Sequence, residues 1–157
     1  MAILNILKEG DATLRKKCRP VEEITPRILQ LLDDMHDTLE VAQGVGLAAP
    51  QVGVLRRIVI VEIDDKKYEM INPEIIETKG KQEEIEACLS VPEQYGLVKR
   101  PAWVKVRAMD RNGKIFEAEG TGLMARCFCH ELDHLDGTLY IDRAIEMYCP
   151  DDIEDAE

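Results

Sequence analysis

Apolar residues recur at helical spacing between residues 25 and 43. Thr25 supplies a capping hydroxyl and Pro26 suits a first helical turn. The apolar positions that follow, spaced to share one face, are Ile28, Leu29, Leu32, Met35 and Leu39. The pattern predicts a helix, and Gly44 is the residue expected to end it.

The middle of the chain shows β-branched runs and alternation instead. RRIVIVEI (56–63) predicts a buried strand, and KKYEMINPEII (66–76) predicts a second strand that ends near Asn72-Pro73. WVKVRAMD (103–110) and KIFEAEG (114–120) flank an Asn-Gly pair that is typical of a β-hairpin turn.

Helical spacing returns in TGLMARCFCHELDHL (121–135), which Gly137 is expected to end. Because helices and strands do not alternate as βαβ units, the pattern indicates an α+β fold. We expect mixed or antiparallel sheets packed around this last helix as the central helix. The length of 157 residues suits one domain, with about 143–157 as a short acidic tail.

Composition restricts the partners and the compartment. The net charge of −11 argues against nonspecific binding to DNA or RNA, which needs a basic face. No apolar run in the sequence approaches the ~20 residues of a membrane span. The start of the chain lacks a basic leader followed by an apolar core, and the five cysteines are an odd number. We therefore expect a cytoplasmic protein with reduced thiols.

Candidate chemistry lies in HELDH (130–134). Residues four apart share a helix face, so His130 and His134 could bind one metal ion, with Glu131 serving a water on that ion. The alternative is a packed surface helix with this spacing by chance. His36, in a charged stretch, is interpreted as a solvated helix histidine.

A third ligand is not found downstream in the usual protease positions. A third histidine six residues past His134 would stand where this chain has Tyr140, and a glutamate about twenty residues on would be Glu154 in the acidic tail. The ligand is therefore expected upstream, and a cysteine thiolate suits zinc and iron.

Sequence position separates the cysteines. Cys127 lies seven residues before the second histidine, about 10 Å along a helix axis, and is better interpreted as a buried wall of the site. Cys129 points to another face, Cys18 stands among basic residues as if at the surface, and Cys149 lies beyond the helix. Cys88 remains as the expected ligand.

Three segments together carry a resemblance to a known family. GVGLAAPQ (44–51), EACLS (86–90) and HELDH (130–134) resemble, in order and spacing, the three motifs of bacterial peptide deformylases, and the similarity runs from about residue 3 to 142. Residues 44–49 also fit a dinucleotide-binding glycine pattern. That pattern must follow a strand and open a helix, whereas here it follows a helix.

The resemblance implies a metal-dependent hydrolase. Cys88, His130 and His134 would bind the ion, and Glu131 would transfer the proton. The substrate would be the N-formylmethionyl end of a nascent peptide, and the products formate and a free amino terminus. The family typically uses Fe²⁺ in cells and accepts Ni²⁺, Co²⁺ or Zn²⁺.

The resemblance also implies the groups around the substrate. The Gln51 side-chain amide and the Leu89 backbone N–H would stabilise charge on the formyl oxygen. The positions that would line the methionine side chain are Val45, Glu86, Leu123 and Cys127. Gly46 would offer backbone hydrogen bonds to the peptide and Tyr95 would contact its backbone. Arg100 would pair with the pocket glutamate as support.

Two departures and the tail qualify the resemblance. Ala87 replaces a glycine and Cys129 replaces a glutamine of the family motifs. Since no ligand is lost we expect activity, with Cys129 raising the sensitivity to oxidation. The acidic carboxyl end should be repelled by RNA phosphates, so we expect weak ribosome docking. The alternatives are a catalytically impaired binding protein and a general metallopeptidase.

Overall fold

Two antiparallel sheets dominate the part of the chain that a computed structural model describes, residues 2–150. The larger sheet has the order β1-β2-β3-β6-β7, with strands Gly46–Ala48, Ile58–Ile63, Lys66–Lys79, Trp103–Met109 and Ile115–Thr121. The smaller sheet has the order β4-β5-β8, with strands Gln82–Cys88, Val91–Arg100 and Ala144–Tyr148. The mixed α+β fold with antiparallel sheets is therefore confirmed.

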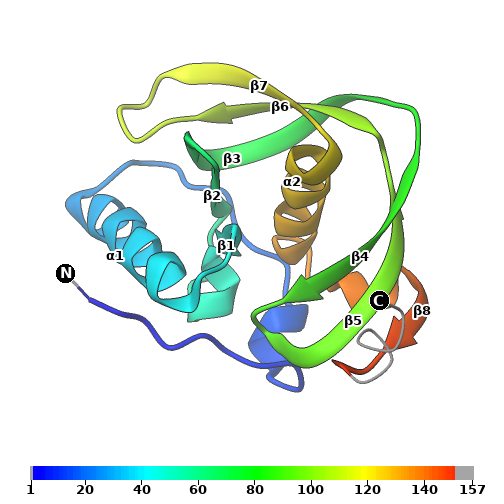
Figure 1. Ribbon diagram of the computed structural model, residues 1–157. Helices are drawn as coiled ribbons and strands as arrows, with labels where there is room; N and C mark the ends of the chain where they lie inside the picture. The colour runs from blue at the N-terminus through cyan, green and yellow to red at the C-terminus, as the bar shows by residue number, and fades with distance from the viewer. Residues whose placement is uncertain (1, 151–157) are drawn as a thin grey trace.

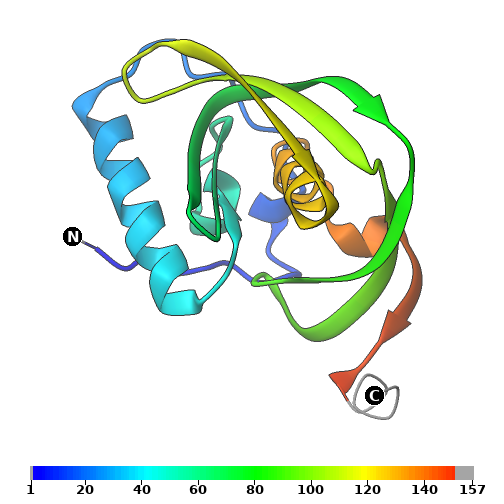
Figure 2. The ribbon, with the colours of Figure 1, turned by 45° about the horizontal axis from the view of Figure 1, so that its top comes forward.

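The two α-helices of this part of the chain pack on different sides of the larger sheet. Helix α1 (Pro26–Ala42) lies outside, against β1 and β2. Helix α2 (Gly122–His134) lies between the two sheets and contacts strands of both (Figures 1 and 2). The second helix is therefore covered on several sides, which buries most of its surface.

Strand β2 shows how one short sequence serves both helices. Side chains along a strand alternate between its two faces. Ile58 and Ile60 accordingly join the core beneath α1, while Val59 and Val61 join the core around α2. Because both faces of this strand are buried, its sequence is apolar at successive positions.

The first helix begins as its sequence predicts. The Thr25 hydroxyl accepts a hydrogen bond from the backbone N–H of Ile28 at 3.3 Å. The stop residue expected at Gly44 is wrong by one residue. The helix ends at Ala42, because Gln43 adopts the left-handed conformation that was expected of glycine.

The strand predictions are correct for the strand with two buried faces and for the two strands that flank the Asn-Gly turn. The strand within 56–63 and the hairpin on either side of residues 110–114 are confirmed as β2, β6 and β7. The end expected at Asn72-Pro73 is wrong, since β3 continues to Lys79. A register shift against β6 and a positive φ at the asparagine accommodate the proline.

The hydrophobic pattern did not predict any of the three strands of the smaller sheet, β4, β5 and β8. β4 is an edge strand with exposed glutamates, and β8 falls inside residues 143–157, which were expected to form only an acidic tail. That expectation is wrong for residues 144–148, which form β8 by pairing with β5. The side chains of β8 are mostly exposed, so the strand depends on this pairing and not on its own burial. Residues 151–157 lie outside the described part. Among residues 2–150 the structure contains no helix that could span a membrane.

His36 belongs to an ion-pair cluster, so its interpretation as a solvated histidine is wrong. Its Nδ1 lies 2.5 Å from Glu62 Oε1 and its Nε2 lies 2.8 Å from Glu69 Oε2, which ties α1 to β2 and β3. Arg111 also donates to Glu69 and to Asp33. The hydrogen bond with Glu69 raises the pKa of His36.

The His36 cluster makes a contribution to stability that depends on pH. Because the pKa of His36 is raised in the folded protein, protonated His36 stabilises the fold fully below its unfolded pKa of about 6.5. This stabilisation is lost as the pH rises through the pKa of His36 in the folded protein. Although burial opposes it, hydrogen bonds from Arg111 and His36 lower the pKa of Glu69 to about 2. The Glu69 contribution is therefore present above its unfolded pKa of about 4.5 and lost in stronger acid.

We expect His36→Gln to lower the melting temperature most between pH ~5 and ~6.5 and clearly less at pH ~9, because the protonated imidazole is what the glutamates stabilise. Thermal unfolding across this range measures the effect, with Arg27→Gln, an exposed position on the same helix, as control. An equal loss at all pH values would show that the cluster acts through packing alone.

Candidate active site

Helix α2 carries the histidine pair on its buried side. His130 and His134 are 9% and 1% exposed, and Ala125, Phe128 and Leu132 anchor the same helix in the core. The four-residue spacing gives the two imidazoles one face, and their ring centroids are 5.2 Å apart. The packed helix thus fixes the direction of both side chains.

Cys88 reaches this pair from the smaller sheet. It ends β4, after a register shift between Glu86 and Cys88, and its Sγ lies 3.5 Å from His134 Nε2. One donor atom from each of Cys88, His130 and His134 lies within 4.8 Å of the others. A thiolate with two imidazoles suits Zn²⁺ or Fe²⁺, so these side chains fit a divalent ion.

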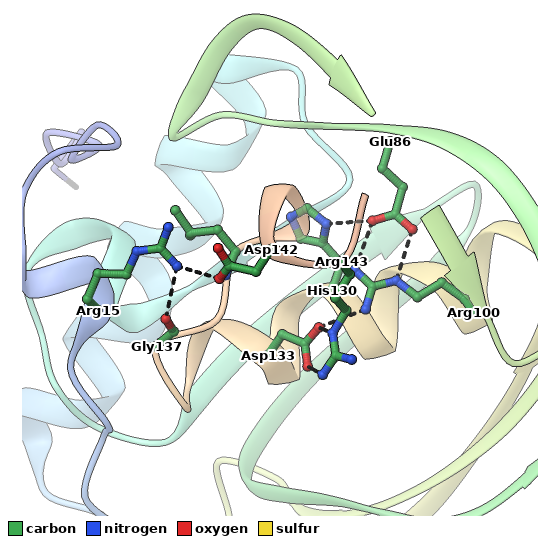
Figure 3. A network of polar contacts seen from close by, with 9 residues as sticks. Arg15, Glu86, Arg100, His130, Asp133, Gly137, Asp142 and Arg143 are labelled. Atoms are coloured by element: carbon green, nitrogen blue, oxygen red, sulfur yellow. Dashed lines mark hydrogen bonds and ion pairs between the residues drawn. The ribbon is translucent and has the colours of Figure 1, made fainter. Parts of the chain in front are cut away.

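A buried ion-pair network sets the orientation of His130 (Figure 3). Its Nδ1 lies 3.0 Å from Glu86 Oε1, and Arg100 donates to both oxygens of Glu86 at 3.0 Å. Although burial opposes it, hydrogen bonds from His130 and Arg100 lower the pKa of Glu86 to about 2. Because the charged carboxylate accepts a hydrogen bond from Nδ1–H, Nε2 of His130 is left without a proton and can face a metal.

The expected pairing of Arg100 with Glu86 is confirmed, and the network continues beyond it. Arg100 also donates to Asp133 at 2.7 Å, and Asp133 accepts from Arg143 at the surface (Figure 3). The Arg100 side chain is only 3% exposed, so carboxylates rather than bulk water meet its charge.

Glu131 lies beside the candidate metal-binding side chains, and one of its carboxylate oxygens has no hydrogen-bond partner among the described residues. This oxygen, Oε1, is buried, and burial raises the pKa of Glu131 to about 7. Gly46 leaves the space for this side chain. A Cβ added at Gly46 would lie 2.6 Å from Glu131 Oε2 and 2.8 Å from Cys127 Sγ. A larger residue at this position would therefore displace the Glu131 or the Cys127 side chain.

The Gln51 amide is held in one orientation. Its oxygen accepts from the Ala48 backbone N–H at 2.9 Å, so its Nε2 faces Ser90 Oγ at 3.0 Å and Cys88 Sγ at 3.6 Å. Ser90 was not predicted from the sequence. Its place two residues after Cys88 in the same motif was the available signal.

A cavity of about 480 Å³ opens onto these groups. The residues expected around the substrate that line it are Val45, Gly46, Glu86, Leu89, Tyr95, Leu123 and Cys127. Val45 and Leu123 are 41% and 44% exposed, which leaves apolar surface open to a ligand. Arg126, which was not predicted from the sequence, lines the cavity too.

The other cysteines and Ala87 show what the departures from the motifs change. Cys18, expected near the surface, is 3% exposed, because its backbone joins Leu135 and its side chain enters the α2 core. Cys129 is 6% exposed and burial raises its pKa to about 11, which argues against the expected sensitivity to oxidation. Ala87 has an exposed side chain and no positive φ, so glycine is not required there.

Comparison with known proteins identifies the class of this site. The family model for polypeptide deformylase matches residues 3–148. A peptide deformylase of Heliobacterium modesticaldum is 51% identical over 143 residues, 91% of this chain and 95% of that protein. The chain belongs to the peptide deformylase family.

Solved structures agree with this assignment. A peptide deformylase from Legionella pneumophila superposes with a TM-score of 0.88 at 45% identity, covering 90% of this chain and 86% of that one. A Met-Ala-Ser-bound class I type b peptide deformylase from Acinetobacter baumannii gives 0.86 at 35% identity, covering 90% and 98%.

The Glu86 network predicts an effect on metal affinity. Glu86→Gln removes the charge that fixes the His130 tautomer, and we expect Zn²⁺ to bind about 10- to 100-fold more weakly. Competition against a chromophoric chelator measures this, with Glu117→Gln, a partner of Arg107 at the surface, as control. Unchanged affinity in a folded Glu86→Gln protein would remove Glu86 from the support of His130.

Proposed function

We propose that this chain is an active peptide deformylase that hydrolyses the formyl amide of N-formylmethionyl peptides and releases formate. The observation that carries the proposal is the meeting of Cys88, His130 and His134 with an unpartnered Glu131 oxygen beside one cavity. An acid–base group next to three metal-binding side chains is what metal-assisted amide hydrolysis needs.

Cys88, His130 and His134 would hold one divalent ion, with Fe²⁺ as the proposed ion in cells and Ni²⁺, Co²⁺ or Zn²⁺ as substitutes. Such an ion supplies Lewis acidity, which polarises the carbonyl and acidifies water. Burial lowers the pKa of His134 well below its usual value, so its imidazole is neutral and able to bind. Helix α2 would then be the metal-binding helix of the fold.

Glu131 would act as the general base and then as the general acid. Its pKa of about 7 lies close to neutral pH, where a carboxyl can both accept and return a proton. The Oε1 atom would take the proton from the attacking water and pass it to the departing amine. The close contact with Gly46 would limit movement of the carboxylate during both transfers.

Gln51 and Leu89 would stabilise the charge that develops on the formyl oxygen. Ala48 and Ser90 keep the Gln51 amide fixed, and Lys8 Nζ donates to the Leu89 carbonyl at 3.3 Å. A donor that is fixed before the reaction does not have to reorganise, and one such donor lowers the activation barrier by ~3 kcal/mol.

The methionine side chain would contact Val45, Leu123 and Cys127, with Glu86 behind them. Gly46 would hydrogen-bond the peptide backbone, and Tyr95 would contact the backbone too. The Met-Ala-Ser bound to the Acinetobacter relative is what deformylation of formyl-Met-Ala-Ser leaves, which supports a peptide of this kind as substrate.

Three further proposals concern the whole chain. It would act as one catalytic domain, and its compartment would be the cytoplasm, where nascent peptides are made. Ribosome docking would be weak, because residues 151–157, which lie outside the described part, are strongly acidic.

Formate release from formyl-Met-Ala-Ser by the iron- or nickel-loaded protein tests the function. We expect Glu131→Gln to lower kcat by about 10²- to 10⁴-fold with the metal still bound, because the proton acceptor is lost. Glu119→Gln, an exposed position on β7, is the matched control and should resemble the wild type.

Other outcomes of the same assay identify the alternatives. A loaded wild-type protein that releases no formate would be an impaired relative that acts by binding. Cleavage of peptide bonds in an N-acetylated peptide would indicate a general metallopeptidase.

A further inference from the structure

Arg126 is the one arginine or lysine among the described residues that line the cavity. It lies on α2 one turn before His130 and is half-buried. The chain as a whole is acidic, with a net charge of −11, so a cation in the cavity wall runs against the overall charge.

The Arg126 side chain has no partner of its own among residues 2–150. Its Nε is buried without a hydrogen-bond acceptor, and its guanidinium forms no ion pair with a described residue. Glu86, in the same cavity wall, is already bound by Arg100 and a histidine. Arg100 and Arg143, the other arginines near the site, each form an ion pair with a carboxylate. Arg126 differs from them because it has no such carboxylate partner among the described residues.

Arg126 lies where it would meet a peptide that runs from the level of His130 toward the amino end of α2. Helical side chains lean toward the amino end of their helix, so the guanidinium is expected to extend away from the level of His130. Arg126 and His130 are four residues apart, which is about 6 Å along the axis. An extended peptide advances about 3.3–3.6 Å per residue, so its second or third residue would come level with the guanidinium.

We propose that Arg126 is a specificity-determining residue that favours substrates with Asp or Glu in the two residues after formylmethionine. This inference rests on the proposed deformylase function. A carboxylate accepts paired hydrogen bonds from a guanidinium and would give the buried Nε its missing acceptor. Glu93, elsewhere in the cavity wall, is exposed, so solvent screens its repulsion of the same carboxylate.

Matched peptides test the proposal. The first pair is formyl-Met-Glu-Ser-amide and formyl-Met-Gln-Ser-amide, and the second is formyl-Met-Ala-Glu-amide and formyl-Met-Ala-Gln-amide. The terminal amide removes the carboxylate that every peptide would otherwise share. The metal-loaded wild type is compared with Arg126→Met, which keeps an unbranched apolar stem. Arg27→Met, at an exposed position on α1, makes the same change in net charge away from the cavity.

The quantity to compare is the ratio of kcat/KM for the Glu peptide to that for its Gln partner. We expect a ratio of about five in the wild type for at least one pair, carried mainly by KM and reduced by about 0.5 M salt. The ratio should fall to about one in Arg126→Met and stay at the wild-type value in Arg27→Met. Because each ratio is taken within one protein, partial misfolding of a variant does not affect it.

Two results would overturn the inference. Formate release without a preference for Glu, or with the same preference in Arg126→Met, would refute the role of Arg126 and leave the deformylase function standing. No formate release from any of the peptides would refute the proposed function and this inference together.

Discussion

The Glu86 carboxylate, buried between Arg100 and His130, is the contact on which the site depends. It joins the smaller sheet to α2, so one charged group links the strand that carries Cys88 to the helix that carries both histidines. Breaking a buried pair of this kind by removing one partner costs about 3–5 kcal/mol, because the other charge is left without compensation. The geometry of the ligands and the stability of the fold therefore depend on the same interaction.

Close packing around α2 completes the arrangement. The larger sheet covers one side of the helix, and β1 runs so near that a side chain at Gly46 would displace Glu131 or Cys127. The Glu131 carboxyl is consequently both desolvated and restrained, which raises its pKa and limits its movement. Gln51 is held from the same segment of chain by Ala48, so the base and the amide donor share one support.

Sequence-based prediction succeeded best for features that local chemistry determines. The histidine spacing, the Thr25 cap and the Asn-Gly hairpin each depend on neighbours within a few residues, and each could be recognised without knowledge of the fold. Cys88 was reached by excluding the other cysteines and then by the resemblance. Its approach to the histidines depends on the pairing of β4 with β5, which no local pattern expresses.

The errors arose where tertiary contacts override local signals. Cys18 stands among basic residues in the sequence, yet its side chain packs in the core around α2. His36 lies in a charged stretch, but the charges that matter come from β2 and β3, far along the chain. Ser90 and Arg126 were missed because their importance depends on what they face in space, Gln51 in one case and an open cavity in the other.

The proposed chemistry depends on a metal held by the Cys88 thiolate together with the two histidines, and the absorption spectrum of the cobalt-loaded protein tests this most directly. Thiolate ligation gives a sulfur-to-cobalt charge-transfer band, and four-coordinate geometry gives intense visible bands. We predict both for the wild type and for Cys127→Ser and Cys129→Ser, and loss of the charge-transfer band in Cys88→Ser. A charge-transfer band that survives in Cys88→Ser, or a weak six-coordinate spectrum in the wild type, would contradict the account.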